Sequence, residues 1–448
     1  MENKNDMSFM CAADNITYQK AKELYYNLDK YDEAFPTIKN EAENGNPEAQ
    51  YILAEMYFYA FGTSFDADKA IEWYNRSACN GWPNAMEQLG DMYANGIEVD
   101  EDEDIAQKWY VKAIKEYQNR AEKGDAESLY YLAGMYYWNS GTIQNRIHAF
   151  DLYKMAAEKG DADAKFQLGK MYSYGEGVEQ DYTKSEEWYR AAAEDFRREA
   201  EQGNLNRQCQ LADMYLSSEC KYGLEYSPEK AMQLYDDAAN KGFSHALYEL
   251  GKMYLYGSGY DLEADKIKGY KYLREAAEQD SICAQAKLCV DIWLESTDYD
   301  QEKCNLEEMY KWALKGAEHG NDTCQLILGC MYSDGLFVQK DINKAREWFC
   351  KAASRGNVDA QYDLGEMYYY GNGVKKDYFE AIKWYKKAAN NYDFRAMYNI
   401  ADMYEYGDGV EYDLAKAFEW YDRASVEIVH AEEKLIVLWP LGLDPEQL

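Results

Sequence analysis

One recurring motif constrains the fold of this chain more than any other feature. It is a leucine or isoleucine followed by a small residue, usually with a Met-Tyr pair shortly after it, and successive copies stand 36, 43, 36, 43, 39, 38, 40, 36 and 36 residues apart. Self-similarity at such a period is typical of solenoids, and about 36 residues suits a two-helix repeat. The ten copies begin at Leu53, Leu89, Leu132, Leu168, Leu211, Leu250, Leu288, Leu328, Leu364 and Ile400.

Residues 84–124 show what one repeat contains. Apolar residues at i, i+4, i+7 and i+8 from Ala85 form one helical stripe, and Gly96 ends that helix. A second periodic run follows and stops at Gly124, where a helix C-terminal cap favours a left-handed residue. The sequence therefore predicts an all-α chain of about eleven helix-turn-helix repeats of 36–43 residues, in which helix A carries the recurring motif and helix B follows it.

The repeats also resemble a known family. The pattern A-x3-LG-x2-Y-x2-GxGV-x2-D-x2-KA-x2-WY-x2-AA-x2-G is clearest at residues 164–193, 360–389 and 396–424, and it is similar to the Sel1-like repeat, a relative of the tetratricopeptide repeat. The resemblance covers roughly residues 30 to 425. It implies a right-handed superhelical solenoid, and it implies an adaptor or scaffold function, since proteins of this family are mostly adaptors and scaffolds with unrelated partners.

The repeat pattern also predicts the organisation of the chain. We expect a loose segment at 1–16, an N-terminal capping repeat at 17–46, ten repeats at 47–425, and a C-terminal capping helix and tail at 426–448. The array is least regular at about 217–305, through drift or because a partner site lies there. In two repeats the distance from the helix B tryptophan to the closing glycine is fifteen residues instead of eight, so these helices should be about 10 Å longer.

Composition restricts the partners. With 48 basic and 82 acidic residues the net charge is −34, which repels phosphate backbones, so nucleic acid is not expected as a partner. Acidity attracts basic proteins, although it also simply keeps a long solenoid soluble. The sequence has no signal-peptide core and no membrane-spanning stretch, which predicts a cytoplasmic protein without membrane insertion. The ten cysteines show no recurring pair, so we expect small buried thiols rather than disulfides.

Catalytic, metal and cofactor motifs are not recognisable. The four histidines lie far apart in different repeats, outside any HExxH, Ser-His-Asp or Cys-His arrangement, and the GxGV turns do not follow a strand. We therefore expect no enzymatic activity, no metal and no cofactor. The methionines of the Met-Tyr pairs have the spacing of the core between helices rather than of a cofactor site.

Helix A also carries aromatic and acidic residues away from its core stripe. Counted from the small residue of the motif, positions −3, +1 and +4 lie on the far side of helix A at 100° per residue, and in tetratricopeptide-type solenoids that side lines the concave surface. The alternative interpretation is that the aromatic residues at position −3 pack against helix A of the neighbouring repeat. The predicted partner-binding residues are Tyr51, Glu55, Phe58, Tyr130, Tyr137, Phe166, Tyr248, Trp293, Tyr362, Glu366, Tyr369, Tyr398 and Asp402.

A groove with aromatic rings and carboxylates between them suits a polypeptide that bears basic and apolar side chains. The leading hypothesis is a non-enzymatic protein-interaction scaffold that binds a partner polypeptide on this concave face. One alternative is an acidic inhibitor or immunity protein that masks a basic partner such as a nuclease. Another is a regulatory subunit that senses a small ligand in the irregular centre. The sequence does not identify the partner or the oligomeric state.

Overall fold

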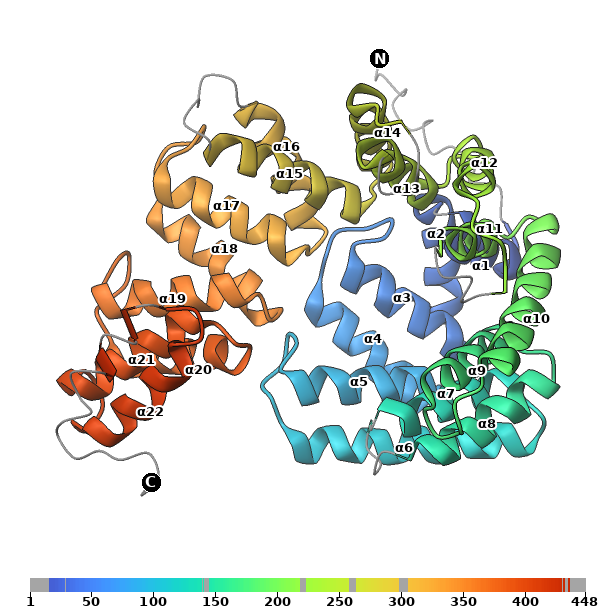
Figure 1. The fold of residues 1–448 in the computed structure, drawn as a ribbon, viewed down its shortest axis with the longest axis horizontal. Coiled ribbons are helices and arrows are strands. Elements are labelled where there is room, and N and C mark those ends of the chain that lie inside the picture. The colour runs from blue at the N-terminus through green and yellow to red at the C-terminus, as the bar shows by residue number, and fades with distance from the viewer. Residues whose placement is uncertain are drawn as a thin grey trace, which may run out of the picture. The chain divides into compact units, whose positions relative to one another are not determined.

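The computed structural model describes residues 16–28, 30–138, 140, 145–217, 223–257, 263–297, 305–428, 430–431 and 434–435. Within these residues the chain forms 22 α-helices and no strand (Figure 1). The helices are α1 (Tyr18–Leu28), α2 (Tyr31–Glu43), α3 (Pro47–Tyr59), α4 (Ala67–Cys79), α5 (Pro83–Asn95), α6 (Glu103–Glu122), α7 (Ala126–Trp138), α8 (Arg146–Glu158), α9 (Ala162–Tyr174), α10 (Tyr182–Glu201), α11 (Leu205–Tyr215), α12 (Pro228–Ala239), α13 (Ser244–Leu255), α14 (Lys266–Glu278), α15 (Ile282–Thr297), α16 (Leu306–Glu318), α17 (Asp322–Asp334), α18 (Ile342–Ser354), α19 (Val358–Tyr370), α20 (Tyr378–Asn390), α21 (Phe394–Tyr406) and α22 (Leu414–Ala424).

These helices form consecutive pairs, in which each odd-numbered helix is a helix A and each even-numbered helix is a helix B. From α1 to α14 and from α16 to α22, each helix packs on the helix that follows it in the chain. The predicted all-α repeat solenoid is confirmed. The predicted loose segment at 1–16 and most of the predicted tail after 426 lie outside the described residues, and the remaining domain boundaries stay predictions.

Side-chain caps explain why the helices begin and end where they do. The aspartate of the GxGV-x2-D pattern is the N-cap of helix B, because its carboxylate accepts a backbone N–H of the first turn, as Asp102 does from Ile105 at 2.9 Å. Helix A ends at a left-handed glycine, with φ of 63° at Gly96 and 70° at Gly175. The motif therefore encodes the turn between the two helices of each repeat.

The glycine of the recurring motif is where helix B approaches helix A most closely. A Cβ at Gly365 would lie 2.4 Å from the ring of Tyr385, so only a residue without a side chain fits under this ring. The nine motif methionines are all buried beside these contacts, as predicted: Met56, Met92, Met135, Met171, Met214, Met253, Met331, Met367 and Met403. The buried residues of neighbouring repeats form shared core clusters, of which the largest extends from Ala21 to Met171.

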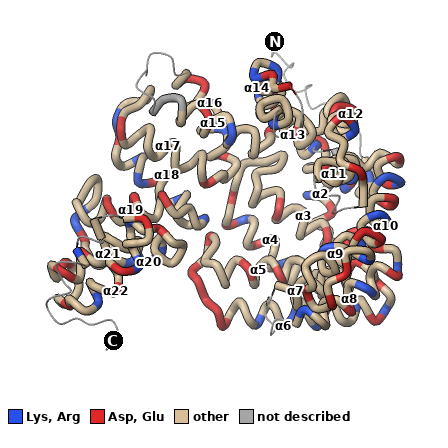
Figure 2. Tube along the Cα trace, viewed as in Figure 1, with Lys and Arg blue, Asp and Glu red and all other residues tan. Residues whose placement is uncertain are grey.

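Two helices B are longer than the others. Helices α6 and α10 each contain 20 residues, whereas the regular helices α4, α18 and α20 contain 13. The prediction of two lengthened helices is confirmed. The turn before α6 also carries the acidic run between residues 98 and 104, which Figure 2 shows as a nearly continuous red stretch between α5 and α6.

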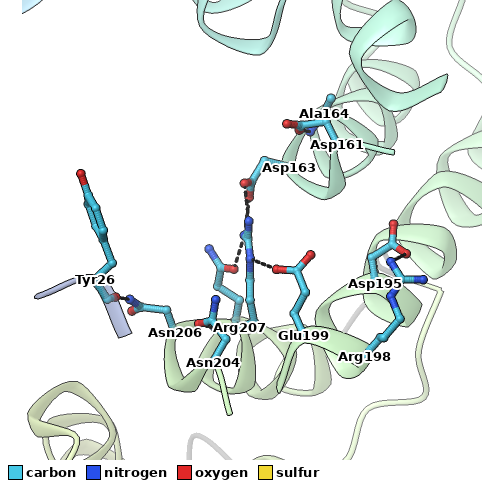
Figure 3. Close-up of polar contacts among 11 residues, drawn as sticks. Tyr26, Asp161, Asp163, Ala164, Asp195, Arg198, Glu199, Asn204, Asn206 and Arg207 are labelled. Atoms are coloured by element: carbon cyan, nitrogen blue, oxygen red, sulfur yellow. Dashed lines mark hydrogen bonds and ion pairs between the residues drawn. The ribbon is translucent and has the colours of Figure 1, made fainter. Parts of the chain in front are cut away.

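The chain divides into two compact units, Met1–Ala284 and Gln285–Leu448. Their boundary falls in α15, inside the range that the sequence marks as irregular. In the first unit α1 contacts α11. The side-chain amide of Asn206 donates a hydrogen bond to the carbonyl oxygen of Tyr26, which is 180 residues away in the sequence (Figure 3). Beside this contact, Arg207 bridges α9 and α10 through two 2.7 Å contacts with Asp163 and one of 2.9 Å with Glu199.

Candidate interaction surface on the A helices

The aromatic residues at position −3 are half-buried because each packs on the helix B tyrosine of its own repeat. The ring centroids are 5.9 Å apart for Tyr51 and Tyr74 and 5.1 Å apart for Phe166 and Tyr189. The same contact recurs at Tyr130, Tyr362 and Tyr398. These aromatic residues therefore pack against helix B of the same repeat while keeping part of their surface accessible.

Carboxylates at position +1 accept hydrogen bonds from the same helix B tyrosines. The Tyr110 hydroxyl donates to Asp91 at 2.7 Å, and the Tyr385 hydroxyl donates to Glu366 at 2.5 Å. The pairs Tyr235–Asp213 and Tyr421–Asp402 repeat this arrangement. Burial raises the pKa of the Asp402 carboxyl, and the hydrogen bond from Tyr421 opposes that shift. Glu366 and Asp402 thus join the two helices of a repeat.

Two repeats lack both the carboxylate and the hydroxyl. In one repeat position +1 is Cys330 and the helix B residue against the glycine is Phe349. In another, position +1 is Lys252 and the corresponding residue is Leu273. In these two repeats neither a buried hydroxyl without an acceptor nor a buried carboxylate without a donor arises, and either would cost free energy. Two other repeats keep the helix B tyrosine, Tyr153 or Tyr189, without a carboxylate at +1.

Glu55 departs from this arrangement. Its carboxylate accepts hydrogen bonds from Tyr51 at 2.8 Å and from Tyr25 of the capping helix at 3.3 Å. The hydroxyl of Tyr74, the helix B tyrosine of this repeat, is buried and has no hydrogen-bond partner among the described residues. Burial raises the pKa of the Glu55 carboxyl to about 7, against the two tyrosine hydrogen bonds that lower it.

Two of the four predicted residues at position +4 are less accessible than predicted. Phe58 and Tyr137 are buried, with exposed fractions of 5% and 6%. The Tyr137 hydroxyl donates to Glu176 in the turn of the next repeat, and the Tyr369 hydroxyl donates to Asp408 in the same way at 2.8 Å. This position faces the neighbouring repeat because, at 100° per residue, it lies only 40° from the motif glycine.

The last two predicted residues lie in the irregular part of the chain. Trp293 on α15 is half-buried. Tyr248 on α13 is also half-buried, with the Lys252 ammonium 5.1 Å from its ring centroid. Whether any of the predicted residues binds a partner stays a prediction.

A third row of helix A residues is the most exposed, and the sequence analysis missed it. In most repeats position +5 is the last helical residue before the turn, and four residues after +1 it continues the stripe of −3 and +1. It carries a large apolar side chain in seven repeats, all of them exposed, from 37% at Tyr59 to 69% at Trp138: Tyr59, Trp138, Tyr174, Tyr256, Leu294, Tyr370 and Tyr406. Aligning the repeats at this position would have found the row.

The junction between α17 and α19 contains a cavity of about 600 Å³. Its lining includes Cys330, Phe349, Asp363 and Glu366, so it opens on the same stripe of helix A. Burial raises the pKa of the Asp363 carboxyl to about 7 and that of the Cys330 thiol to about 12. This cavity lies wholly within the second unit.

Other site classes find no support in the described part of the chain. No group of three or more His, Cys, Asp or Glu residues there is arranged to hold a metal ion. No helix there is long and apolar enough to cross a membrane. The side chains of Cys209, Cys289 and Cys324 are buried, as predicted. That prediction is wrong for three other free thiols, which are exposed, at Cys79, Cys283 and Cys350.

Comparison with protein families identifies the repeats. The family model of the Sel1 repeat matches the chain in nine segments, at residues 47–82, 83–116, 126–161, 162–195, 208–243, 244–281, 323–357, 358–393 and 394–425. Among curated proteins, chitin synthase regulatory factor 3 of Schizosaccharomyces pombe is 31% identical over 136 residues. The matched stretch is 30% of this chain and 14% of that protein, so the chain spans only a small part of this relative.

Solved structures give similar relatives. A protective antigen of uropathogenic Escherichia coli with an SLR fold is 29% identical over 92% of this chain and 91% of that chain, with a TM-score of 0.48. A Sel1 repeat protein from Oxalobacter formigenes is 27% identical over 72% of this chain and 90% of that chain, with a TM-score of 0.49.

Proposed function

Since the chain belongs to the Sel1 repeat family, whose members generally mediate protein–protein interactions, we propose that it is a non-enzymatic scaffold that binds a partner polypeptide along its A helices. The binding surface would be the stripe formed by positions −3, +1 and +5, which we call the A stripe. The observation that carries this proposal is the row of exposed aromatic side chains at position +5.

Three properties of the A stripe suit a polypeptide partner. Tyrosine and tryptophan supply a large contact area and lose little rotamer entropy on binding. The half-buried rings at −3 are held by helix B, so they are already ordered before a partner arrives. The carboxylates at +1 supply negative charge between the rings, which favours a partner with basic as well as apolar side chains.

A matched pair of variants tests the proposal. The stripe variant replaces Trp138, Tyr174, Tyr370 and Tyr406 by alanine. The control variant replaces four aromatic residues of similar exposure outside the A stripe, namely Tyr182, Phe379, Tyr392 and Tyr412. Each tagged protein captures partners from the native cytosol at low and at high ionic strength, and mass spectrometry identifies them.

A stoichiometric partner that binds the wild type and the control variant at both ionic strengths, but not the stripe variant, would support the scaffold. A partner that the stripe variant still captures would contradict the use of the A stripe. If that partner is also lost at high ionic strength, the result favours the alternative of an acidic inhibitor or immunity protein, because screening weakens interactions between exposed charges.

A further inference from the structure

The last repeat holds a lysine that comes from outside the repeat array. Lys434 follows α22, and its ammonium lies 2.6 Å from Glu405 and 3.6 Å from Asp402. It also donates to the Tyr406 hydroxyl at 3.0 Å and lies 5.5 Å from the ring centroid of Tyr421. The A stripe of this repeat therefore binds an ammonium group between two carboxylates and two aromatic rings, as cation–π and charge-assisted contacts favour. We call this arrangement the lysine site.

In the preceding junction, between α19 and α21, a side chain of the next helix A takes the position that Lys434 has in the last repeat. The Asn399 side-chain amide on α21 donates to Glu366 at 2.8 Å, and Tyr385 donates to the same carboxylate oxygen at 2.5 Å. A carboxylate at +1 is thus satisfied by one donor from helix B and one from the next helix A. Asn399 in this junction and Lys434 in the last repeat both contact the carboxylate at position +1.

The junction between α17 and α19 reverses these chemical roles. Position +1 is Cys330, and helix B presents Phe349, which has no hydroxyl. The next helix A presents a carboxylate, Asp363, at the position that Asn399 occupies in its own repeat. Among the described residues Asp363 makes neither a hydrogen bond nor an ion pair, although the positive charge of Arg395 lowers the pKa of its carboxyl against the effect of burial. The cavity of about 600 Å³ occupies this place.

The lining of the cavity matches a basic side chain. Three carboxylates, of Asp334, Asp363 and Glu366, face a single cation, Lys340. Phe349, Ile342 and Met367 form apolar walls, which suit the alkyl stem of a lysine, since such a stem packs on apolar surface while its ammonium stays among polar groups. A cation in the cavity would give Asp363 the partner that it lacks within the chain.

We propose that the cavity between α17 and α19 receives a lysine side chain of the partner polypeptide, with Asp363 as its main counter-charge. The proposal rests on the proposed scaffold function, and it names the chemistry of one contact with that partner. Lys434 in the last repeat is the intramolecular precedent for this contact.

The test uses the full chain and two small probes, N-acetyl-lysine-N-methylamide and its uncharged analogue N-acetyl-norleucine-N-methylamide. Saturation-transfer NMR titrations measure the affinity of each probe, and crystals soaked with the lysine probe locate it. Asp363→Asn keeps the shape of the side chain and removes its charge. Glu419→Gln, at an exposed helix B position, makes the same change of charge away from the cavity.

We expect the lysine probe to occupy the cavity and the norleucine probe to bind at least about tenfold more weakly. Asp363→Asn should lower the affinity for the lysine probe about tenfold, whereas Glu419→Gln should leave it unchanged. Lys434→Met should open a second position for the lysine probe beside Asp402. Equal binding of the two probes, or unchanged binding to Asp363→Asn, would overturn the proposal. If a partner binds the A stripe but the lysine probe does not occupy the cavity, this proposal fails and the proposed scaffold function stands. If the lysine probe occupies the cavity but the protein has no partner, only the scaffold function is contradicted.

Discussion

The buried carboxylate of Glu87 gives the sharpest prediction about stability. Glu87 lies on α5 at position −3, where most other repeats have an aromatic residue, and it accepts a hydrogen bond of 2.8 Å from the Tyr117 hydroxyl on α6. Burial raises the pKa of the Glu87 carboxyl from 4.5 to about 7, the Tyr117 hydrogen bond opposes the shift, and the nearby charge of Asp91 adds to it. The folded state therefore holds this proton more tightly than the unfolded chain does.

The sign and size of the effect follow from linkage. Between pH 4.5 and about pH 7 the folded protein binds the proton and the unfolded chain releases it, so the free energy of unfolding falls as pH rises through this range. A rise of the Glu87 pKa from 4.5 to about 7 corresponds to roughly 3 kcal/mol, because each tenfold change in proton affinity is worth about 1.4 kcal/mol. This loss of stability from ionising Glu87 is complete above about pH 7 and absent below pH 4.5.

Glu87→Gln removes the ionisable group and keeps an oxygen that accepts from Tyr117. We expect Glu87→Gln to raise the free energy of unfolding by about 2 kcal/mol at pH 8, since the weaker neutral hydrogen bond offsets part of the gain, and to change it little at pH 5. Tyr117→Phe should do the opposite and destabilise most at pH 8, where the carboxylate loses its donor. Urea denaturation from pH 5 to pH 8 measures both. A Glu87→Gln effect that is independent of pH would refute the reasoning.

Two further pairs of substitutions test the packing and the ion pairs. Gly365→Ala should destabilise by about 1–3 kcal/mol, because its methyl group would meet the Tyr385 ring, whereas Gly134→Ala, whose nearest neighbour would be 3.7 Å away, should be neutral or stabilise by up to about 1 kcal/mol. Arg207→Met should lower the free energy of unfolding by about 1–2 kcal/mol, because it leaves two half-buried carboxylates without their cation. Arg76→Met removes an exposed i,i+4 ion pair and should change the free energy of unfolding by less than about 0.5 kcal/mol. Urea denaturation at pH 7 measures all four, and equal effects within either pair would contradict the packing or the ion-pair argument.

The repeat pattern predicted the fold because the residues that define each helix lie close to that helix in the sequence. The N-cap aspartates such as Asp102, the left-handed glycines such as Gly96 and the buried methionines lie within a few residues of the elements that they define. The lengthened helices α6 and α10 could be predicted for the same reason, since seven extra residues in a periodic run extend the helix without turning its apolar face. The division at Ala284 could not be predicted, because it depends on contacts between repeats.

The interaction surface was only partly predictable. A helical wheel places Tyr51 and Glu55 correctly on one stripe, but it does not say on which side the next repeat stacks. In the structure the turn of the next repeat covers position +4, as the hydrogen bond from Tyr369 to Asp408 shows, so the aromatic residues there are less accessible than predicted. Position +5, at Trp138 and Tyr174 for example, remains uncovered because helix A ends immediately after it.

The contact between α1 and α11 changes how the first unit can lose its structure. A linear repeat array is held by neighbouring contacts alone, so its end repeats can fray independently of the rest. Here the first helix also touches the sixth helix pair, through Asn206 and the Tyr26 carbonyl oxygen. Opening the capping helix must therefore break contacts at two distant points of the sequence at once. This couples the first helix to the sixth helix pair and makes fraying of the N-terminal repeat more cooperative than the repeat architecture alone implies.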